Sequence, residues 1–360
     1  MAVSAIRPTI LVTSAGGKTG MPVALQLLER GFPVRAFLRR EDARARRLRD
    51  AGASIFIGDQ YSVQDMRAAM RGVQRAYHCA PMAANGLHFG AIFAVAAREA
   101  RLEHVVILSQ WLSDPQHGAL ATREVWLNEQ LLSVLPDTTV TVNNVGWFAD
   151  NYFLVLDVMA QLGVMPMPLG DGSVAKDAPP SNEDIAAVSA AALADPSTHA
   201  GKVYRPTGPS LISPDEIAAS VGSALGRPVR YEAISDAMFF KAMQATGRPV
   251  FAQTQLGYYV EEYRRGTFAV GAPSGVLPAV VGREAEDFAT IARRYVRTRP
   301  EAVRTLTTRL SAAWGMLRIL ATPPLRAERV ERERDHVLLR DGALAIDLER
   351  WQSSHARVSP

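Results

Sequence analysis

The chain has 360 residues, of which 48% are hydrophobic, and a formal net charge of +4. This length and hydrophobic content exclude wholesale disorder and allow one large domain with a smaller companion. A slight positive excess, without a clustered basic face, predicts no nucleic-acid partner. The single cysteine, Cys79, excludes an internal disulfide and fits a reducing, cytoplasmic environment. No apolar run approaches the roughly 20 residues that span a bilayer, so we expect no integral membrane segment.

Short apolar, β-branched runs alternate with helical patterns through the first 145 residues. Strands are predicted at 9–14, 33–39, 53–59, 74–80, 104–110 and 139–145, and helices at 20–30, 42–50, 63–71, 86–101 and 119–135. Nearly continuous apolar strands indicate burial on both faces, as in a parallel sheet covered by helices. The pattern predicts an α/β fold with a doubly wound parallel (Rossmann) sheet, and a dinucleotide-binding domain over residues 1–150.

The pattern changes after residue 150. Residues 163–180 are rich in glycine and proline and predict a loop. Capped helices are predicted at 181–196 and 213–226, and strands at 202–209 and 228–235, followed by a mostly helical segment. We interpret residues 151–297 as a smaller, mostly helical substrate domain, whose strands could return to the main sheet.

The last part of the chain, residues 298–360, is predicted to be a helical and hairpin extension. Residues 301–335 form a long helical region that places Val303, Leu306, Leu310, Trp314 and Leu317 on one face. Such a face could lie on a membrane, although we favour packing on its own domain or on a second subunit of a homodimer. A hairpin is predicted at 338–348.

A glycine-rich turn lies between the first strand and the first helix. Gly17 and Gly20 fit the last two positions of a G-x-x-G-x-x-G turn, and Ser14 stands at the first. Glycines let the backbone approach a phosphate, and the helix N-terminus presents free N–H groups to it. Ser14 is tolerated there if its φ is negative, and a turn without ligand is the alternative. The candidate cofactor residues are Thr13, Ser14, Gly16, Gly17, Lys18, Thr19 and Gly20.

The end of the second predicted strand indicates which dinucleotide is preferred. An acidic residue there would accept from the ribose 2′-OH of NAD, but this chain has Arg39 and Arg40. A guanidinium pairs bidentately with a 2′-phosphate, so we predict NADPH. The alternative is that both arginines face solvent or pair with Glu41 and Asp42. Further contacts are predicted from Asp59 and Gln60 to the adenine, and from Ala80, Pro81 and Met82 to the nicotinamide ribose.

Several stretches resemble the NmrA-like atypical short-chain dehydrogenases in sequence and in order: "VTSAGGKTG", "VRAFLRR", "IFIGDQ", "HVVILSQ" and "NVGWFADNYF". The resemblance covers about residues 8–297. It implies either an NADPH-dependent reductase of quinones, ketones, alkenes or aromatic ethers, or an NADP-sensing regulator without turnover. The order of these motifs is specific for the superfamily and less so for an activity.

The chain departs from the Tyr-x-x-x-Lys pair of conventional short-chain dehydrogenases. In that pair the phenol donates a proton and the ammonium lowers its pKa. After Ser109 the next tyrosine is Tyr152, which has Leu156 four places on. Glu129 matches an acid often present in the family, but the lysine position is Val125.

Four residues remain as catalytic candidates. Ser109 ends a strand at the edge where ligands bind in this fold, and it could hydrogen-bond a substrate carbonyl or only cap the strand. His117 is a loop residue with a pKa near neutrality, which suits an acid, although many loop histidines are surface residues. Tyr152 could donate a proton. Arg123 could hold the ribose or an oxyanion, but its pKa is too high for acid–base work.

The predicted substrate pocket has an apolar wall formed by Trp111, Val145, Gly146, Trp147 and Phe148. We therefore predict an NADPH-dependent oxidoreductase of a small hydrophobic carbonyl, quinone or activated alkene. Acceptors with a delocalised developing anion need less proton donation, which fits the missing Tyr/Lys pair. The alternatives are a non-catalytic NADP(H) sensor, and an isomerase or lyase that uses the nucleotide transiently. No metal site is predicted.

Overall fold

The computed structural model describes residues 7–323, 327–333 and 342–356. Its main sheet has seven parallel strands in the order β3-β2-β1-β4-β5-β6-β8. The strands are β1 Ile10–Val12, β2 Val34–Leu38, β3 Ser54–Ile57, β4 Arg75–His78, β5 His104–Gln110, β6 Thr139–Val145 and β8 Val203–Tyr204. The predicted doubly wound sheet is confirmed, and β8 is a strand that returns to it from beyond residue 150.

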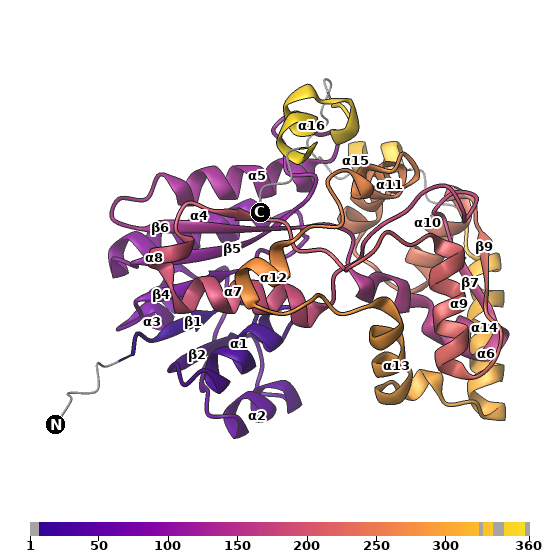
Figure 1. Ribbon diagram of the computed structural model, residues 1–360, viewed down its shortest axis with the longest axis horizontal. Helices are drawn as coiled ribbons and strands as arrows, with labels where there is room; N and C mark the ends of the chain where they lie inside the picture. The colour runs from indigo at the N-terminus through magenta and orange to yellow at the C-terminus, as the bar shows by residue number, and fades with distance from the viewer. Residues whose placement is uncertain (1–6, 324–326, 334–341, 357–360) are drawn as a thin grey trace.

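Helices cover both faces of this sheet (Figure 1). One face carries α1 Gly20–Glu29, α2 Ala43–Asp50 and α7 Asn182–Ala194, and the other carries α3 Val63–Met70, α4 Gly86–Ala100 and α5 Leu120–Ser133. Successive strand side chains point to opposite faces. Ile10 and Val12 accordingly pack beside Leu27 on the α1 side, while Leu11 packs beside Phe89 on the α4 side. This double burial explains the continuous apolar strands.

Side-chain caps fix the starts of two helices that follow residue 180. Ser181 accepts a hydrogen bond from the Asp184 backbone N–H at 3.0 Å and begins α7. Ser213 and Glu216 form a capping box at the start of α9, Pro214–Leu225. Each cap satisfies N–H groups that have no partner inside the helix, and both helices were predicted from these residues.

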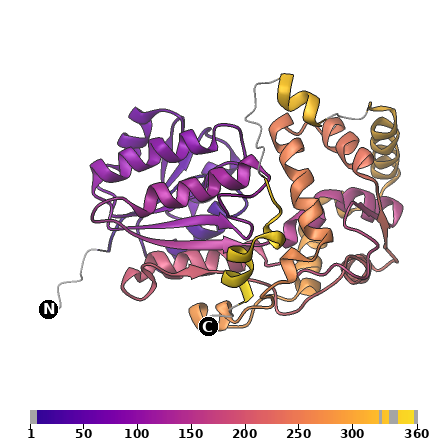
Figure 2. The same ribbon diagram turned by 90° about the horizontal axis from the view of Figure 1, so that it is seen from above.

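A second lobe lies beside the main sheet (Figure 2). It is built around a two-stranded parallel sheet of β7, Val164–Met167, and β9, Arg230–Ala233. The prediction of a loop throughout 163–180 is therefore wrong. Pro166 is tolerated in β7 because a strand with a partner on one side only does not need every N–H. The helices of this lobe are η1 Ala149–Val155, α6 Leu156–Leu162, α9, α10 Asp236–Ala245, α11 Val250–Arg264, η2 Thr267–Ala269, α13 Phe288–Thr298, η3 Pro300–Ala302 and α14 Leu306–Ala321.

The remaining short helices are α8 Pro196–His199, α12 Val276–Val281, α15 Ala327–Glu333, η4 Ala345–Asp347 and α16 Glu349–Ala356. No helix among the described residues is both long and apolar enough to cross a bilayer.

The C-terminal segment, residues 342–356, lies at the junction of the sheet and the second lobe in both views (Figures 1 and 2). Trp351 is buried and donates from Nε1 to the Trp111 carbonyl at 2.7 Å, and Arg350 pairs with buried Asp114 at 2.6 Å. The predicted hairpin is corrected on its second arm, because residues 345–347 form η4 instead of a strand. Its first arm, 338–341, lies outside the described residues.

Candidate functional site

The glycine turn forms a close-packed loop between β1 and α1. Ser14 has φ of +50°, in the left-handed region, so the expectation that it tolerates the turn through a negative φ is wrong. Its Oγ donates to the Cys79 carbonyl at 3.0 Å, and its own carbonyl accepts from the Gly17 N–H at 2.7 Å. These two bonds hold a non-glycine residue in a conformation that usually favours glycine.

Gly20 and Gly17 leave no room for a side chain. A Cβ on Gly20 would lie 2.4 Å from the Ser14 carbonyl oxygen, and a Cβ on Gly17 would lie 3.0 Å from the same atom. The N-cap residue of α1, Thr19, makes no side-chain cap, and the first turn of α1 has no acidic residue. An uncapped helix start beside bare backbone is the arrangement that binds a pyrophosphate. The turn therefore fits a dinucleotide.

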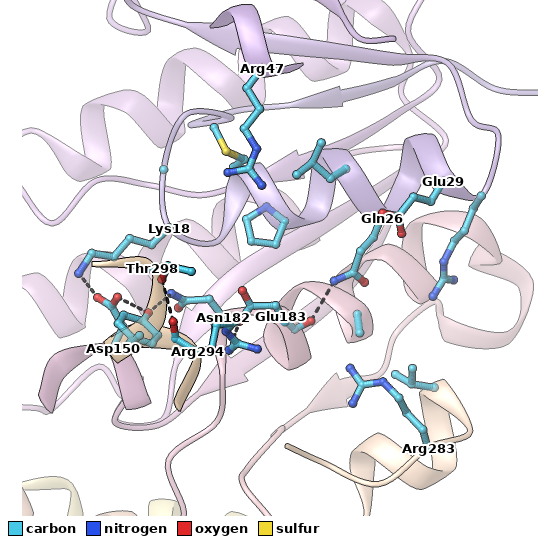
Figure 3. Close-up of a pocket in the computed structure, with 18 of the residues that line it drawn as sticks. Lys18, Gln26, Glu29, Arg47, Asp150, Asn182, Glu183, Arg283, Arg294 and Thr298 are labelled. Atoms are coloured by element: carbon cyan, nitrogen blue, oxygen red, sulfur yellow. Dashed lines mark hydrogen bonds and ion pairs between the residues drawn. The ribbon is translucent and has the colours of Figure 1, made fainter. Parts of the chain in front are cut away.

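The other polar residues of the turn have partners within the protein. The Thr13 hydroxyl donates to the Tyr77 carbonyl at 2.8 Å, which fastens β1 to β4, and Thr19 is also buried. Lys18 forms an ion pair with Asp150 at the start of η1 (Figure 3). Lys18 therefore connects the glycine turn to the second lobe, and its predicted contribution of positive charge to the cofactor stays a prediction.

Arg39–Arg40 is exposed at the end of β2. Of the two alternatives, pairing with the following acids does not hold in this structure, whereas the solvent-facing orientation is the one observed. Glu41 pairs with Arg49 at 2.6 Å, and Asp42 pairs with Arg44 at 2.5 Å. Both guanidinium groups of Arg39–Arg40 thus stay in solvent at the strand end where a 2′-phosphate would lie.

Asp59 and Gln60 follow β3 at the same edge. The Asp59 carboxylate accepts from the Tyr61 N–H at 3.0 Å, and its own N–H donates to Asp65 at 2.7 Å, so the loop after β3 is ordered locally. Gln60 is buried. Their contact with adenine stays a prediction.

We expect the double variant Arg39→Ala/Arg40→Ala to weaken NADPH binding by about 2–3 kcal/mol and NADH binding little, because charged hydrogen bonds to the 2′-phosphate are lost. Calorimetric titration of both nucleotides would measure this. The matched control is Arg46→Ala, which removes another exposed arginine, on α2. Equal weakening of NADPH and NADH would contradict the assignment of the phosphate.

An apolar pocket of about 370 Å³ opens at the carboxyl ends of β4, β5 and β6. On the sheet side its walls include all five residues predicted to form it: Trp111, Val145, Gly146, Trp147 and Phe148. The same walls also include Ala80, Pro81, Met82 and Ser109. The second lobe closes it with Met167, Phe239, Met243, Leu256, Tyr259 and Phe268. The structure thus brings the predicted nicotinamide and substrate residues together in one cavity.

Two polar residues of α5 also line this pocket, and the sequence analysis did not single them out. Burial raises the pKa of the Glu124 carboxyl to about 7. Asn128 is 2% exposed, and neither its Oδ1 nor its Nδ2 has a hydrogen-bond partner among the described residues. Unsatisfied buried amides are rare and indicate a ligand or water. Gly90 makes room for Asn128, because a Cβ there would lie 1.6 Å from Oδ1.

Ser109 reaches the pocket wall but already has a partner. Its hydroxyl donates to Glu129, which also accepts from Ser113 at 2.8 Å. Burial raises the pKa of Glu129, and these two hydrogen bonds oppose the rise. The Ser109 hydroxyl thus gives its only proton to Glu129 and can accept from a ligand, but in this arrangement it cannot donate to a substrate carbonyl. Its direct role stays a prediction.

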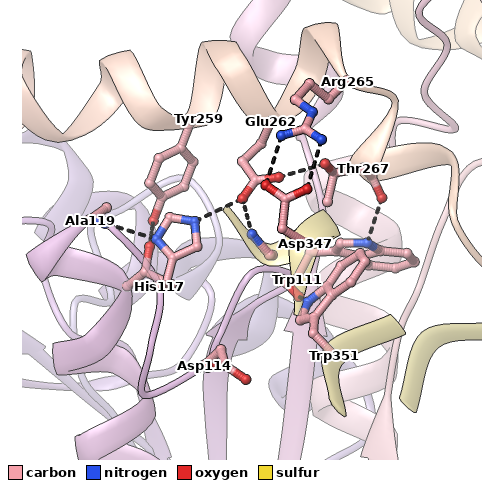
Figure 4. Close-up of polar contacts among 12 residues, drawn as sticks. Trp111, Asp114, His117, Ala119, Tyr259, Glu262, Arg265, Thr267, Asp347 and Trp351 are labelled. Carbon is pink, nitrogen blue, oxygen red and sulfur yellow. Dashed lines mark hydrogen bonds and ion pairs between the residues drawn. The ribbon is translucent and has the colours of Figure 1, made fainter. Parts of the chain in front are cut away.

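The other three catalytic candidates lie outside the pocket lining. Tyr152 is fully buried, donates to Tyr263 Oη at 3.0 Å, and has a pKa raised well above its usual value by burial. His117 is also fully buried and bonds Glu262 at 3.0 Å (Figure 4). Arg123 donates from Nε to the His117 carbonyl at 2.6 Å. The geometry contradicts their predicted roles, so we leave all three out of the proposed site.

A second, larger pocket of about 820 Å³ follows α1 from Gly17 and Lys18 toward Arg30 (Figure 3). It lies between α1, α7 and α13, and two of its charged residues, Arg294 and Glu183, pair with each other at 2.7 Å. It shares Gly17 and Lys18 with the turn and contains none of the strand-end residues described above.

A glycine turn that opens α1 at the carboxyl edge of a sheet with this strand order defines a dinucleotide-binding protein of the Rossmann class. Residues 7–128 match the model of the NmrA-like family. A curated relative, an NAD(P)H azoreductase from Xenophilus azovorans, is 32% identical over 294 residues, which are 79% of this chain and 97% of that protein. The chain belongs to the NmrA-like family.

Two solved structures show the same fold. An NADPH-dependent quinone oxidoreductase from Escherichia coli in complex with NADPH has a TM-score of 0.68 at 23% identity, and the match covers 79% of this chain and 99% of that one. NmrA, a negative transcriptional regulator in complex with NADP, has a TM-score of 0.68 at 18% identity, with 82% and 98% covered. The predictions of an oxidoreductase and of a nicotinamide dinucleotide cofactor agree with the name of the NAD(P)H azoreductase relative.

Proposed function

We propose that this chain is an NADPH-dependent reductase of apolar, conjugated acceptors, such as a quinone, an azo compound or an activated alkene. The observation that carries the proposal is the apolar pocket at the strand ends, into which Glu124 brings one carboxyl with a pKa of about 7. The names of the azoreductase and quinone oxidoreductase relatives support the same class of acceptor.

Different residues at the carboxyl edge of the sheet would bind different parts of the cofactor. The backbone of Gly17 and Gly20, with the start of α1, would hold the pyrophosphate, and Arg39–Arg40 would hold the 2′-phosphate. Ala80, Pro81 and Met82 would lie along the nicotinamide ribose. When bound, NADPH supplies a hydride at the pocket.

A hydride delivers one proton and two electrons to the acceptor. Complete reduction of the acceptor requires one further proton. Glu124 can donate it, because a carboxyl with a pKa of about 7 is about half protonated in neutral solution and mostly protonated in slightly acidic solution. The unpartnered Asn128 amide offers a donor to an acceptor oxygen or nitrogen. Trp111 and Trp147 provide flat apolar walls that exclude water and suit a planar acceptor.

The test is calorimetric titration with NADPH and NADH, followed by NADPH oxidation with a benzoquinone, an azo dye, an enone and a simple saturated ketone. We expect tight NADPH binding and turnover of the conjugated acceptors well above that of the ketone. Absence of nucleotide binding, or a preference for the saturated ketone, would overturn the proposal.

A redox sensor is the second candidate. The Lys18–Asp150 ion pair joins the glycine turn to η1 in the second lobe, so nucleotide binding at the turn can alter a contact between the two parts. The similarity in fold to the regulator NmrA supports this candidate. Two results together would favour the sensor. The first is tight NADPH binding without turnover of any acceptor. The second is an NADPH-induced change in the contact between the turn and the second lobe that is lost in Lys18→Met.

A further inference from the structure

The outer face of α14 is a continuous apolar stripe. Leu306, Leu310, Trp314, Leu317 and Leu320 are 73%, 62%, 68%, 58% and 50% exposed, respectively. Their spacing of three or four residues places all five on one side of the helix. Most large apolar side chains are buried, and a contiguous exposed group of them marks a contact surface.

The opposite side of α14 attaches the helix to the protein. Ala312 is buried there, and Thr308 donates to Gln161 of α6 at 3.1 Å. Lys241 of α10 donates to the Leu320 carbonyl at 3.2 Å. The packed side also carries the half-buried Met316 and Ile319, while the five residues of the stripe point outward. Of the two favoured predictions for this stripe, packing on its own domain is wrong within the described residues, and packing on a second subunit stays a prediction.

The charged residues between positions 303 and 322 all have one sign. Arg309 and Arg318 are exposed and lie on its two edges, since each residue turns the helix by about 100°. Arg304 precedes the helix, and residues 303–322 contain no Asp or Glu. An exposed tryptophan, leucines and flanking arginines without acids are the features of a helix that lies in a membrane interface.

We propose that α14 docks this protein on the surface of an anionic membrane, with the stripe in the lipid boundary and the arginines among the headgroups. Pairing with a second copy fits less well. A two-fold contact through the stripe would place the arginines of both copies along one seam, and residues 303–322 have no carboxylate to pair with them. Anionic headgroups supply that charge.

The docking face lies close to the pocket. α14 packs against α10, and α10 contributes Phe239 and Met243 to the pocket wall. At the edge of the second lobe, α14 faces away from the sheet (Figure 1). A protein docked through α14 would therefore hold the α10 side of the pocket near the membrane.

The test is flotation of the full chain with vesicles of phosphatidylcholine alone and with vesicles that contain phosphatidylglycerol. We expect binding to the anionic vesicles, weakened by salt, and a blue shift of emission that is absent in Trp314→Phe. The double variant Leu310→Glu/Leu317→Glu should lower the partition coefficient roughly 10-fold or more. Arg309→Gln/Arg318→Gln should lower binding to anionic vesicles only.

The matched control is Val174→Glu, an exposed apolar residue outside α14 that is 76% exposed and should leave binding unchanged. NADPH titration of every variant checks the fold and keeps this result separate from the proposed function. Failure to float with anionic vesicles would overturn the proposal. The proposal would also be overturned if light scattering detected a dimer that the double glutamate substitution dissociates and that anionic vesicles do not.

Discussion

The variant Glu124→Gln should reduce the rate of NADPH-dependent reduction by about 100-fold to 10,000-fold, while NADPH affinity changes little. Glutamine keeps the size and polarity of Glu124 but has no acidic proton. The loss should be greater for an enone than for a quinone, because the quinone anion is more stable and needs protonation less. Steady-state rates and calorimetric titration would measure both effects.

The pH profile gives an independent test of the same residue. An acid must be protonated to donate, and burial raises the pKa of Glu124 to about 7. We therefore expect kcat/KM to be constant at low pH and to fall tenfold per pH unit above about 7. Glu124→Gln should lose this alkaline limb. The control Glu284→Gln removes an exposed carboxyl outside the pocket and should retain it. A variant at Glu124 with an unchanged rate and an unchanged alkaline limb would contradict the role.

Much of the fold follows from local patterns in the sequence. The six predicted strands through residue 145 and the five helices between them agree with the structure within a few residues, because continuous apolar strands and helical periodicity are local signals. β7 was missed since its glycine and proline content is typical of loops. Its partner, β9, is more than 60 residues away and leaves no mark on the sequence around Val164.

The pocket walls were predictable because the carboxyl ends of parallel strands meet at one edge of the sheet. The directions in which individual side chains point were not predictable from the sequence. Tyr152 follows β6 directly but turns to Tyr263, and His117 is covered by Glu262 and by the C-terminal segment. Glu124 and Asn128 could have been found, since both lie within one helical turn of Val125 at the lysine position. Only burial, however, gives Glu124 a pKa near neutrality.

The second large effect should come from Glu262, whose removal should lower the free energy of unfolding by about 3–5 kcal/mol. Its carboxyl group is fully buried and accepts from His117 Nε2 at 3.0 Å, from Thr267 Oγ1 at 2.5 Å and from the Ala345 N–H (Figure 4). Glu262→Ala leaves these donors buried without a partner. Urea denaturation of the purified variant would measure the loss.

Glu262 also joins three parts of the chain, because His117 follows β5, Thr267 lies in η2 and Ala345 belongs to the C-terminal segment. Hydrogen exchange should therefore rise first in residues 343–351. Glu262→Gln keeps the volume but can accept through one oxygen only, so it should lose less, about 1–3 kcal/mol. The control Asp347→Ala breaks an exposed ion pair with Arg265 and should cost at most about 1 kcal/mol. If Glu262→Ala were no less stable than this control, the buried carboxyl would not be what fastens the C-terminal segment to the body.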